Sequence, residues 1–367
     1  MTRGAPVTAR TSPATPDADA SPLPWLLESD DPSVRFFTLT GLLDSAPDAP
    51  EATAARRDIM SRGTVPRILA AQRDDGHWQG RDGFYAAKYQ GTVWQLLILA
   101  ELGADGADER VRRGCEAVLR DSQDAESGGF AANRAKKGGG GLHSRVIPCL
   151  TGNLVFSFVR FGLLDDPRVQ AAVDWLTTYA RCDDGDGDAP TGWPYDAWQM
   201  CWGRHTCHMG VVKTLKALAE IPSERRSPAV RRTLDDGVEF LLRHHVHKRS
   251  HDLSKDSKPG WKRLGFPLMY QTDVLEILGI LTKLGRAGDE RAGEARALVA
   301  SKADAQGRWK LQDTFNGRFV VDIETKGEPS RWITLRALTA LGAFTPPGVL
   351  APLGALAPRV TARRPSP

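Results

Sequence analysis

Sulfur and imidazole side chains gather at two places in this sequence. Cys149 follows a proline, and Cys201, His205, Cys207 and His208 lie within one short segment further along. Thiolates and imidazoles are zinc ligands, and a catalytic zinc needs three protein ligands with a fourth position open. We therefore predict a zinc site from these five residues and leave magnesium open as another ion. The alternative is that the cysteines are small buried hydrophobic residues and the histidines cap or hydrogen-bond to loops.

The geometry of the second group depends on where its helix begins. If the helix begins near Cys201, then Cys201, His205 and His208 are four and seven residues apart and share one side of it. If it begins near His205, only the two histidines share that side. In both cases we expect Cys149, at the start of the preceding apolar helix, to lie close enough to these residues to share a metal ion with them.

A basic segment is the second candidate site. Residues 246–270 contain six Lys or Arg and two Asp, interleaved with aromatic residues. Converging Lys and Arg side chains form strong charge-assisted bonds to phosphate groups. The alternative is an ordinary solvated loop. We expect an anion to be bound by Lys248, Arg249, His251, Lys262 and Arg263, together with Arg331 from a later segment.

Tyr270 and Asp273 form a third candidate, just before an apolar helix. Asp273 could face a cavity as an acid or a ligand, with Tyr270 beside it, and we predict both as catalytic. The alternative for Asp273 is a helix N-cap, for which Asp is a favoured residue. The acidic run 183–188 is interspersed with glycine and is interpreted as a flexible turn, because glycines give a magnesium site no rigidity.

These residues are positioned by a repeat. An apolar helical stretch that ends in a small turn recurs about every 60 residues and is followed by a second, amphipathic helix. Six such turns are visible, at residues 42–44, 102–103, 161–162, 221–222, 284–285 and 341–342. The first helix of each pair is apolar nearly all round, which is typical of a buried helix, and the second carries charges on one side.

The repeat predicts an all-α fold, a single (α/α)6 toroid with six inner helices ringed by outer ones. We place the toroid at residues 25–345, between disordered tails at 1–24 and 346–367. The inner helices are expected near 33–43, 91–102, 150–162, 205–219, 271–284 and 331–341. The long returns all precede inner helices, so they should gather at one end and form the mouth of the site.

Two closing segments carry a family resemblance. Gln72 is followed by Asp-Gly-His-Trp78, and Gln306 is followed by Gly-Arg-Trp309. Glycine allows the sharp turn and the indole packs over the preceding helix end. These segments resemble the Gln-and-Trp repeat of squalene cyclases. Over about residues 25–345 the chain resembles the superfamily of terpenoid cyclases and protein prenyltransferase β-subunits, and its length suits the single-toroid prenyltransferase type.

The resemblance extends to the metal residues. His205-Thr-Cys207 looks like the segment that carries the zinc histidine of prenyltransferase β-subunits, and Cys149 looks like their zinc cysteine. Those enzymes have an Asp two residues before that cysteine, where this chain has Ile147; Cys201 or His143 could replace it. The Asp-any-Asp-Asp motif with which class II cyclases protonate an alkene is absent from the sequence.

The resemblance implies an isoprenoid-handling protein. We expect a prenyltransferase-like or cyclase-like enzyme that holds a prenyl diphosphate or polyprene in an apolar barrel, with zinc and the basic rim at one mouth. The alternatives are a non-catalytic toroid that binds a lipid or peptide, and a scaffold for a partner protein. A partner subunit of the kind prenyltransferases use is left open.

Composition sets the remaining limits. Of 367 residues, 41% are hydrophobic, which supports a large core, and the net charge of +4 is too small to indicate nucleic-acid binding. The five cysteines form an odd set, and the first residues do not resemble a secretion signal. No apolar run approaches the ~20 residues of a membrane span. We therefore expect a cytoplasmic protein.

Overall fold

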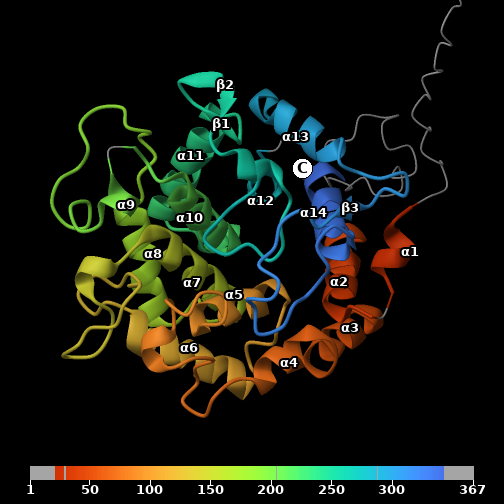
Figure 1. Ribbon diagram of the computed structural model, residues 1–367, viewed down its shortest axis with the longest axis horizontal. Helices are drawn as coiled ribbons and strands as arrows, with labels where there is room; N and C mark the ends of the chain where they lie inside the picture. Colours follow the sequence, from red (N-terminus) through yellow and green to blue (C-terminus); the bar gives the residue numbers. More distant parts are fainter. Residues whose placement is uncertain (1–20, 29, 204, 287, 343–367) are drawn as a thin grey trace, which may run out of the picture.

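The computed structural model describes residues 21–342 apart from residues 29, 204 and 287, and it shows helix pairs arranged in a ring (Figure 1). Six inner helices surround the centre, and the toroid predicted from the repeat is confirmed. They are α2 (Pro32–Phe37, continued by a π-helical turn, Thr38–Leu42), α5 (Thr92–Glu101), α7 (Pro148–Arg160), α10 (His208–Glu220), α12 (Val274–Lys283) and α14 (Arg331–Gly342).

The outer ring consists of amphipathic helices whose charged sides face away from the core. Its members are α3 (Pro50–Ser61), α4 (Thr64–Ala70), α6 (Glu109–Ser122), α8 (Pro167–Tyr179), α11 (Pro228–Arg243) and α13 (Gly293–Ala300). Short elements complete the described chain: α1 (Leu23–Leu26), α9 (Gln199–Trp202), and the strand pairs β1 (Lys248–Arg249) with β2 (Asp252–Asp256) and β3 (Trp309–Lys310) with β4 (Pro329–Ser330).

The closing segments join neighbouring repeats by hydrogen bonds. The Gln72 side chain donates to the Gly76 carbonyl at 3.0 Å and to the Arg110 carbonyl at 2.8 Å, and so ties its own turn to the next outer helix. The Trp78 indole nitrogen donates to the Ile68 carbonyl at 2.7 Å and holds the ring over the end of α4. The Trp309 indole nitrogen donates to the Val299 carbonyl near the end of α13 in the same way, at 2.7 Å. This explains why Trp recurs here, because buried carbonyls at a helix end need donors.

Close packing between α7 and α10 depends on one glycine. A Cβ atom added at Gly152 would lie 2.5 Å from the Lys213 carbonyl oxygen, closer than atoms can approach without moving. Gly152 therefore lets the two backbones touch. This contact fixes the part of α10 that carries Lys213 and Lys216 against the centre of the ring.

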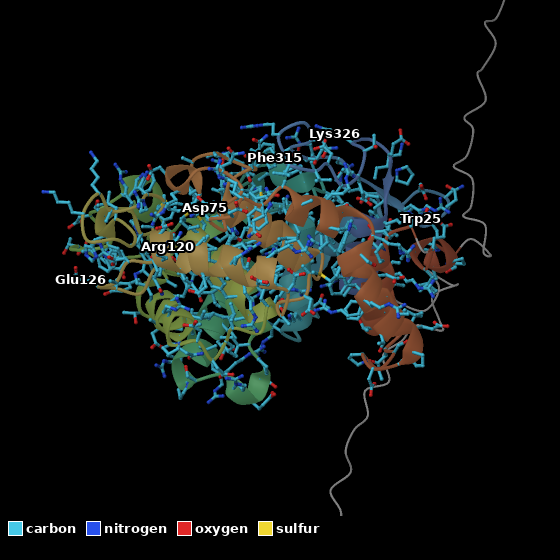
Figure 2. The ribbon with its side chains drawn as sticks, turned by 90° about the horizontal axis from the view of Figure 1, so that it is seen from below. Trp25, Asp75, Arg120, Glu126, Phe315 and Lys326 are labelled. Carbon is cyan, nitrogen blue, oxygen red and sulfur yellow. The ribbon has the colours of Figure 1, made fainter. Side chains whose placement is uncertain are left out.

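The long returns gather at the end where the inner helices begin, and they pack against one another there. Tyr89 stacks on Phe315 with ring centroids 4.1 Å apart, and Asn153 Nδ2 donates to the Met269 carbonyl at 3.1 Å. Figure 2 shows Phe315 and Lys326, both from the return between β3 and β4, together on one edge of the molecule. This end, predicted as the mouth, is covered to a large extent by its own loops.

Most of the two predicted tails, 1–24 and 346–367, lies outside the described residues, so the domain limits stay predictions. Among the helices that the structure does describe, none is long and apolar enough to cross a membrane.

Candidate functional site

The inner helices enclose a cavity of about 500 Å³, here called the lumen. All six contribute to its wall. Phe37, Glu101 and Arg160 lie at the carboxyl ends of their helices, whereas Leu275 and Trp332 lie at the beginnings of α12 and α14. The lining comprises Phe37, Gly41, Glu101, Phe156, Arg160, Lys216, Ala219, Glu220, Leu275, Glu276, Gly279, Ile280, Thr282, Lys283, Trp332, Leu335, Arg336 and Thr339.

Much of the lumen wall is apolar and aromatic. Phe37 and Trp332 have ring centroids 6.0 Å apart, and Phe156 lies beneath the charged ends of Arg160 and Lys216. A Cβ added at Gly41 or at Gly279 would meet nothing within 4 Å, so both glycines border open space. A cavity of this size and lining is typical of a small-molecule site.

One side of the lumen, here called the lumen floor, is a buried network of ion pairs. It is formed by Glu101, Lys213, Lys216, Glu276 and Arg336. Lys213 Nζ donates to both carboxylate oxygens of Glu276, at 2.8 and 2.7 Å, and Lys216 Nζ donates to Glu276 Oε1 at 2.9 Å. Lys216 also donates to Glu101, whose other oxygen accepts from Arg336 Nη2 at 2.6 Å. Lysine and glutamate are almost never buried unless paired, and the pairing here is complete for both carboxylates.

The network is ionised at neutral pH. Burial alone would raise the pKa of Glu276, but the charges of Lys213 and Lys216 outweigh it and lower that pKa to about 2. For Glu101, burial is likewise outweighed by Arg336 and Lys216, and its pKa falls to about 2. Burial lowers the pKa of Lys213 to about 8, although Glu276 opposes the shift.

A second, shallower set of charges forms the lumen rim. Glu220 accepts from Lys283 Nζ at 2.7 Å and lies 3.7 Å from Arg160 Nη1. The exposed fraction of the side chains rises from 0% at Lys213 through 9% at Lys216 to 44% at Lys283, which shows that the lumen opens toward the carboxyl ends of the inner helices.

The predicted metal residues are separated by the fold. Cys201 lies in the short helix α9, His205 is exposed in the loop after it, and His208 is the first residue of α10. Neither of the two alternatives for the start of this helix holds, because α9 ends at Trp202 and α10 begins only at His208. The His208 ring instead packs against Trp261 and His244, with centroids 4.5 and 4.6 Å away.

Cys149 is buried, whereas Cys201 and Cys207 are partly exposed. Burial raises the pKa of the Cys149 thiol, and the nearby Cys201 and Cys207 raise it further. Cys201 and Cys207 also line one small cavity beside Pro148. Within the described residues, no three Cys, His, Asp or Glu side chains are grouped so that they could hold a metal ion, and zinc stays an untested prediction.

The basic segment does not form one rim. Lys248 ion-pairs with Glu294 of the outer helix α13 at 2.6 Å, and Lys262 pairs with Asp256 at 2.6 Å, so this hairpin lies beside the outer ring (Figure 1). Arg249 and His251 are exposed. Arg331 pairs with Glu28 near α1. Lys248 and Lys262 both lie beside Asp256, whereas Arg331 is held elsewhere, so the predicted anion ligands do not converge on one point.

Arg263 and Tyr270 line a cavity of about 430 Å³ at the loop-covered end, together with Trp261 and Phe315. Asp273 is not among the residues of either cavity wall. It is 2% exposed, caps α12 and accepts from the backbone nitrogens of Glu276 and Gly265, both at 2.8 Å. Burial raises its pKa to about 6 against these two bonds. The N-cap interpretation of Asp273 is what the structure shows, and a catalytic role stays untested.

The sequence did contain a signal for the residues that were missed. Glu101, Lys213, Lys216 and Glu276 stand in helices that are otherwise apolar nearly all round. A charge in such a helix has to find a partner of opposite sign inside the fold, and it therefore marks the interior of the ring. The partners themselves lie far apart in the sequence.

Comparisons with known proteins give a likeness of fold alone. No family model matches the chain, and no curated protein matches it. A solved structure of the type II terpene cyclase MstE from Scytonema in complex with geranylgeranyl dihydroxybenzoate is 16% identical, with 80% of this chain and 74% of that chain covered and a TM-score of 0.43. A protein from Actinoplanes is 16% identical, covering 82% and 79%, with a TM-score of 0.44.

Proposed function

We propose that this protein is an isoprenoid-handling enzyme that holds the hydrocarbon part of its substrate in the lumen. The observation that carries the proposal is the lumen itself, an apolar and aromatic cavity to which all six inner helices contribute. The resemblance of the closing segments to the Gln-and-Trp repeat supports the same substrate class. Burial of a hydrocarbon chain against such a wall is favourable by about 25 cal/mol per Å².

The charges of the lumen favour one kind of reaction over another. Glu101 and Glu276 are ionised, so neither can protonate an alkene to start a cyclisation. Loss of a diphosphate fits better: the carbon–oxygen bond breaks, its electron pair leaves with the diphosphate, and the allylic cation is captured by an acceptor nucleophile. Trp332 also lines the lumen, and an aromatic face stabilises a cation at short range.

Incubation with prenyl diphosphates of increasing chain length tests the proposal. Purified protein is assayed with and without Zn²⁺ or Mg²⁺ and with thiol and aromatic acceptors, the products are extracted, and bound metal is measured in parallel. We expect release of diphosphate that the variant Gly279→Phe abolishes, because a phenyl ring at that position fills the lumen. Neither binding nor turnover of any isoprenoid would overturn the proposal.

The metal assay includes two variants. If Cys149 and its neighbouring thiols hold zinc, Cys149→Ser lowers the zinc content, whereas His208→Ala does not, because the His208 ring packs against Trp261. Equal zinc content in both variants and the native protein would contradict that part of the proposal.

A second candidate is a non-catalytic toroid that binds a lipid. It is favoured by the ionised state of both buried carboxylates, which leaves the lumen floor without a proton donor among those two groups. Saturable binding of a prenyl compound with no product under any metal condition would select this candidate.

A further inference from the structure

The lumen carries more positive than negative charge. Its lining contains four cations and three anions, an excess of one positive charge: Arg160, Lys216, Lys283 and Arg336 against Glu101, Glu220 and Glu276. A cleft that is lined by an excess of one charge attracts a ligand of the opposite charge.

Three of these cations converge on Glu101. Lys216 and Arg336 each bind one of its oxygens. Arg160 lies beside them, because its guanidinium and Lys216 Nζ lie over the same Phe156 ring, 5.6 and 4.4 Å from the ring centroid. Arg160 reaches this position because its Nε donates to the Ala100 carbonyl at 3.0 Å, one residue before Glu101. The point where Arg160, Lys216 and Arg336 meet is here called the cation hub, and all three line the lumen.

The guanidinium groups of the cation hub have N–H donors that no described residue uses. Arg336 uses only Nη2 for Glu101, and its Nε and Nη1 make no hydrogen bond to the described part of the chain. The same holds for Nη2 of Arg160 among the described residues. Guanidinium groups bind carboxylate and phosphate oxygens through two parallel N–H bonds, which a lysine cannot imitate.

We infer that the lumen ligand has an anionic head, a carboxylate or a phosphate, and that this head binds at the cation hub while the apolar part lies along Leu275, Trp332 and Leu335. This rests on the proposed function for the nature of the apolar part. The negative charge of the head then balances the excess positive charge of the lumen lining. The basic hairpin around Lys248 has no part in it, because that hairpin lies beside α13.

The experiment compares a prenyl alcohol with its monophosphate, its diphosphate and the corresponding carboxylic acid, all of one chain length, by isothermal titration. We expect the alcohol to bind and the anionic forms to bind at least about tenfold more tightly, with a preference that decreases as salt is added. Arg336→Gln should lower the affinity for the anionic forms about tenfold and leave the affinity for the alcohol nearly unchanged.

Arg286→Gln is the matched control, because Arg286 is an exposed arginine whose partner is Asp235 on the outer surface. It should bind every ligand as the native protein does. Arg336→Lys keeps the charge without the planar fork and should recover part of the lost affinity. If Arg336→Gln does not fold, the affinities of the native protein for the alcohol and for the anionic forms still test whether the lumen binds an anionic head.

The outcomes separate the two proposals. Equal affinity of the native protein for the alcohol and the anionic forms overturns the cation hub and leaves the isoprenoid lumen intact. Preference for the anionic forms that Arg336→Gln and Arg160→Gln both leave unchanged overturns the assigned position of the head. If none of the four compounds binds, the proposed function fails and the inference fails with it.

Discussion

Lys213 donates to both carboxylate oxygens of Glu276, at 2.8 and 2.7 Å, and this buried pair joins two inner helices of the toroid. The two residues come from α10 and α12, which are neighbours in the ring. Gly152 of α7 touches the backbone of Lys213 from the other side. The pair therefore links three inner helices, and the lumen floor depends on it.

Removing Glu276 should cost more stability than removing Lys213. Glu276→Leu leaves two buried lysines without a shared partner, and we expect it to lower the free energy of unfolding by about 3–5 kcal/mol. Lys213→Met leaves Glu276 still bound to Lys216 and should cost roughly 1–3 kcal/mol. Urea denaturation measures both, and the reverse order would contradict the described network.

Acid should destabilise the protein through the same carboxylates. The pKa of Glu101 and of Glu276 is about 2 in the folded chain and 4.5 in the reference state. Between these values the unfolded chain binds protons that the folded chain does not, so stability falls as the pH drops from 4.5 toward 2. Urea denaturation at a series of pH values should show this fall, with a shallower slope in Glu276→Gln than in the native protein. An unchanged slope would contradict the prediction that Glu276 is ionised in the folded protein.

Substitutions at Gly279 test whether the lumen is open at that position. Gly279→Ala should raise the free energy of unfolding by about 0.4–1 kcal/mol, because a Cβ there meets nothing and the unfolded chain loses freedom. Ligand binding should persist in this variant. Gly279→Phe should fold as well and lose binding of prenyl compounds, as calorimetry can show. Binding that survives the phenylalanine would place the ligand elsewhere.

Gly152 should behave in the opposite way. Gly152→Ala puts a Cβ 2.5 Å from the Lys213 carbonyl, so the helices must move apart at a cost of roughly 1–3 kcal/mol. Thermal and urea denaturation beside Gly279→Ala give a matched comparison, because both changes add the same methyl group inside an inner helix. Equal stability of the two variants would refute the tight contact between α7 and α10.

The ring was predictable from the sequence because an apolar helix followed by an amphipathic helix recurs at a regular spacing along the chain. Thr92–Glu101 is apolar all round, while Glu109–Ser122 carries charges on one side, and this difference alone assigns the first to the inside and the second to the outside. The closing Gln72 and Trp78 act locally, on a turn and a helix end a few residues away.

The site was not predictable in the same way. The charges in the apolar helices indicate which sides face inward but not which charges pair, so the meeting of Glu101, Lys216 and Arg336 depends on how three helices are placed against one another. The end at which the lumen opens depends on how the loops pack, as Tyr89 does on Phe315. The sequence by itself determined the number, order and polarity of the helices, because these follow from short-range pattern. Only the tertiary structure decided which charges meet in the lumen, because burial forces each of them to find a partner from a distant part of the chain.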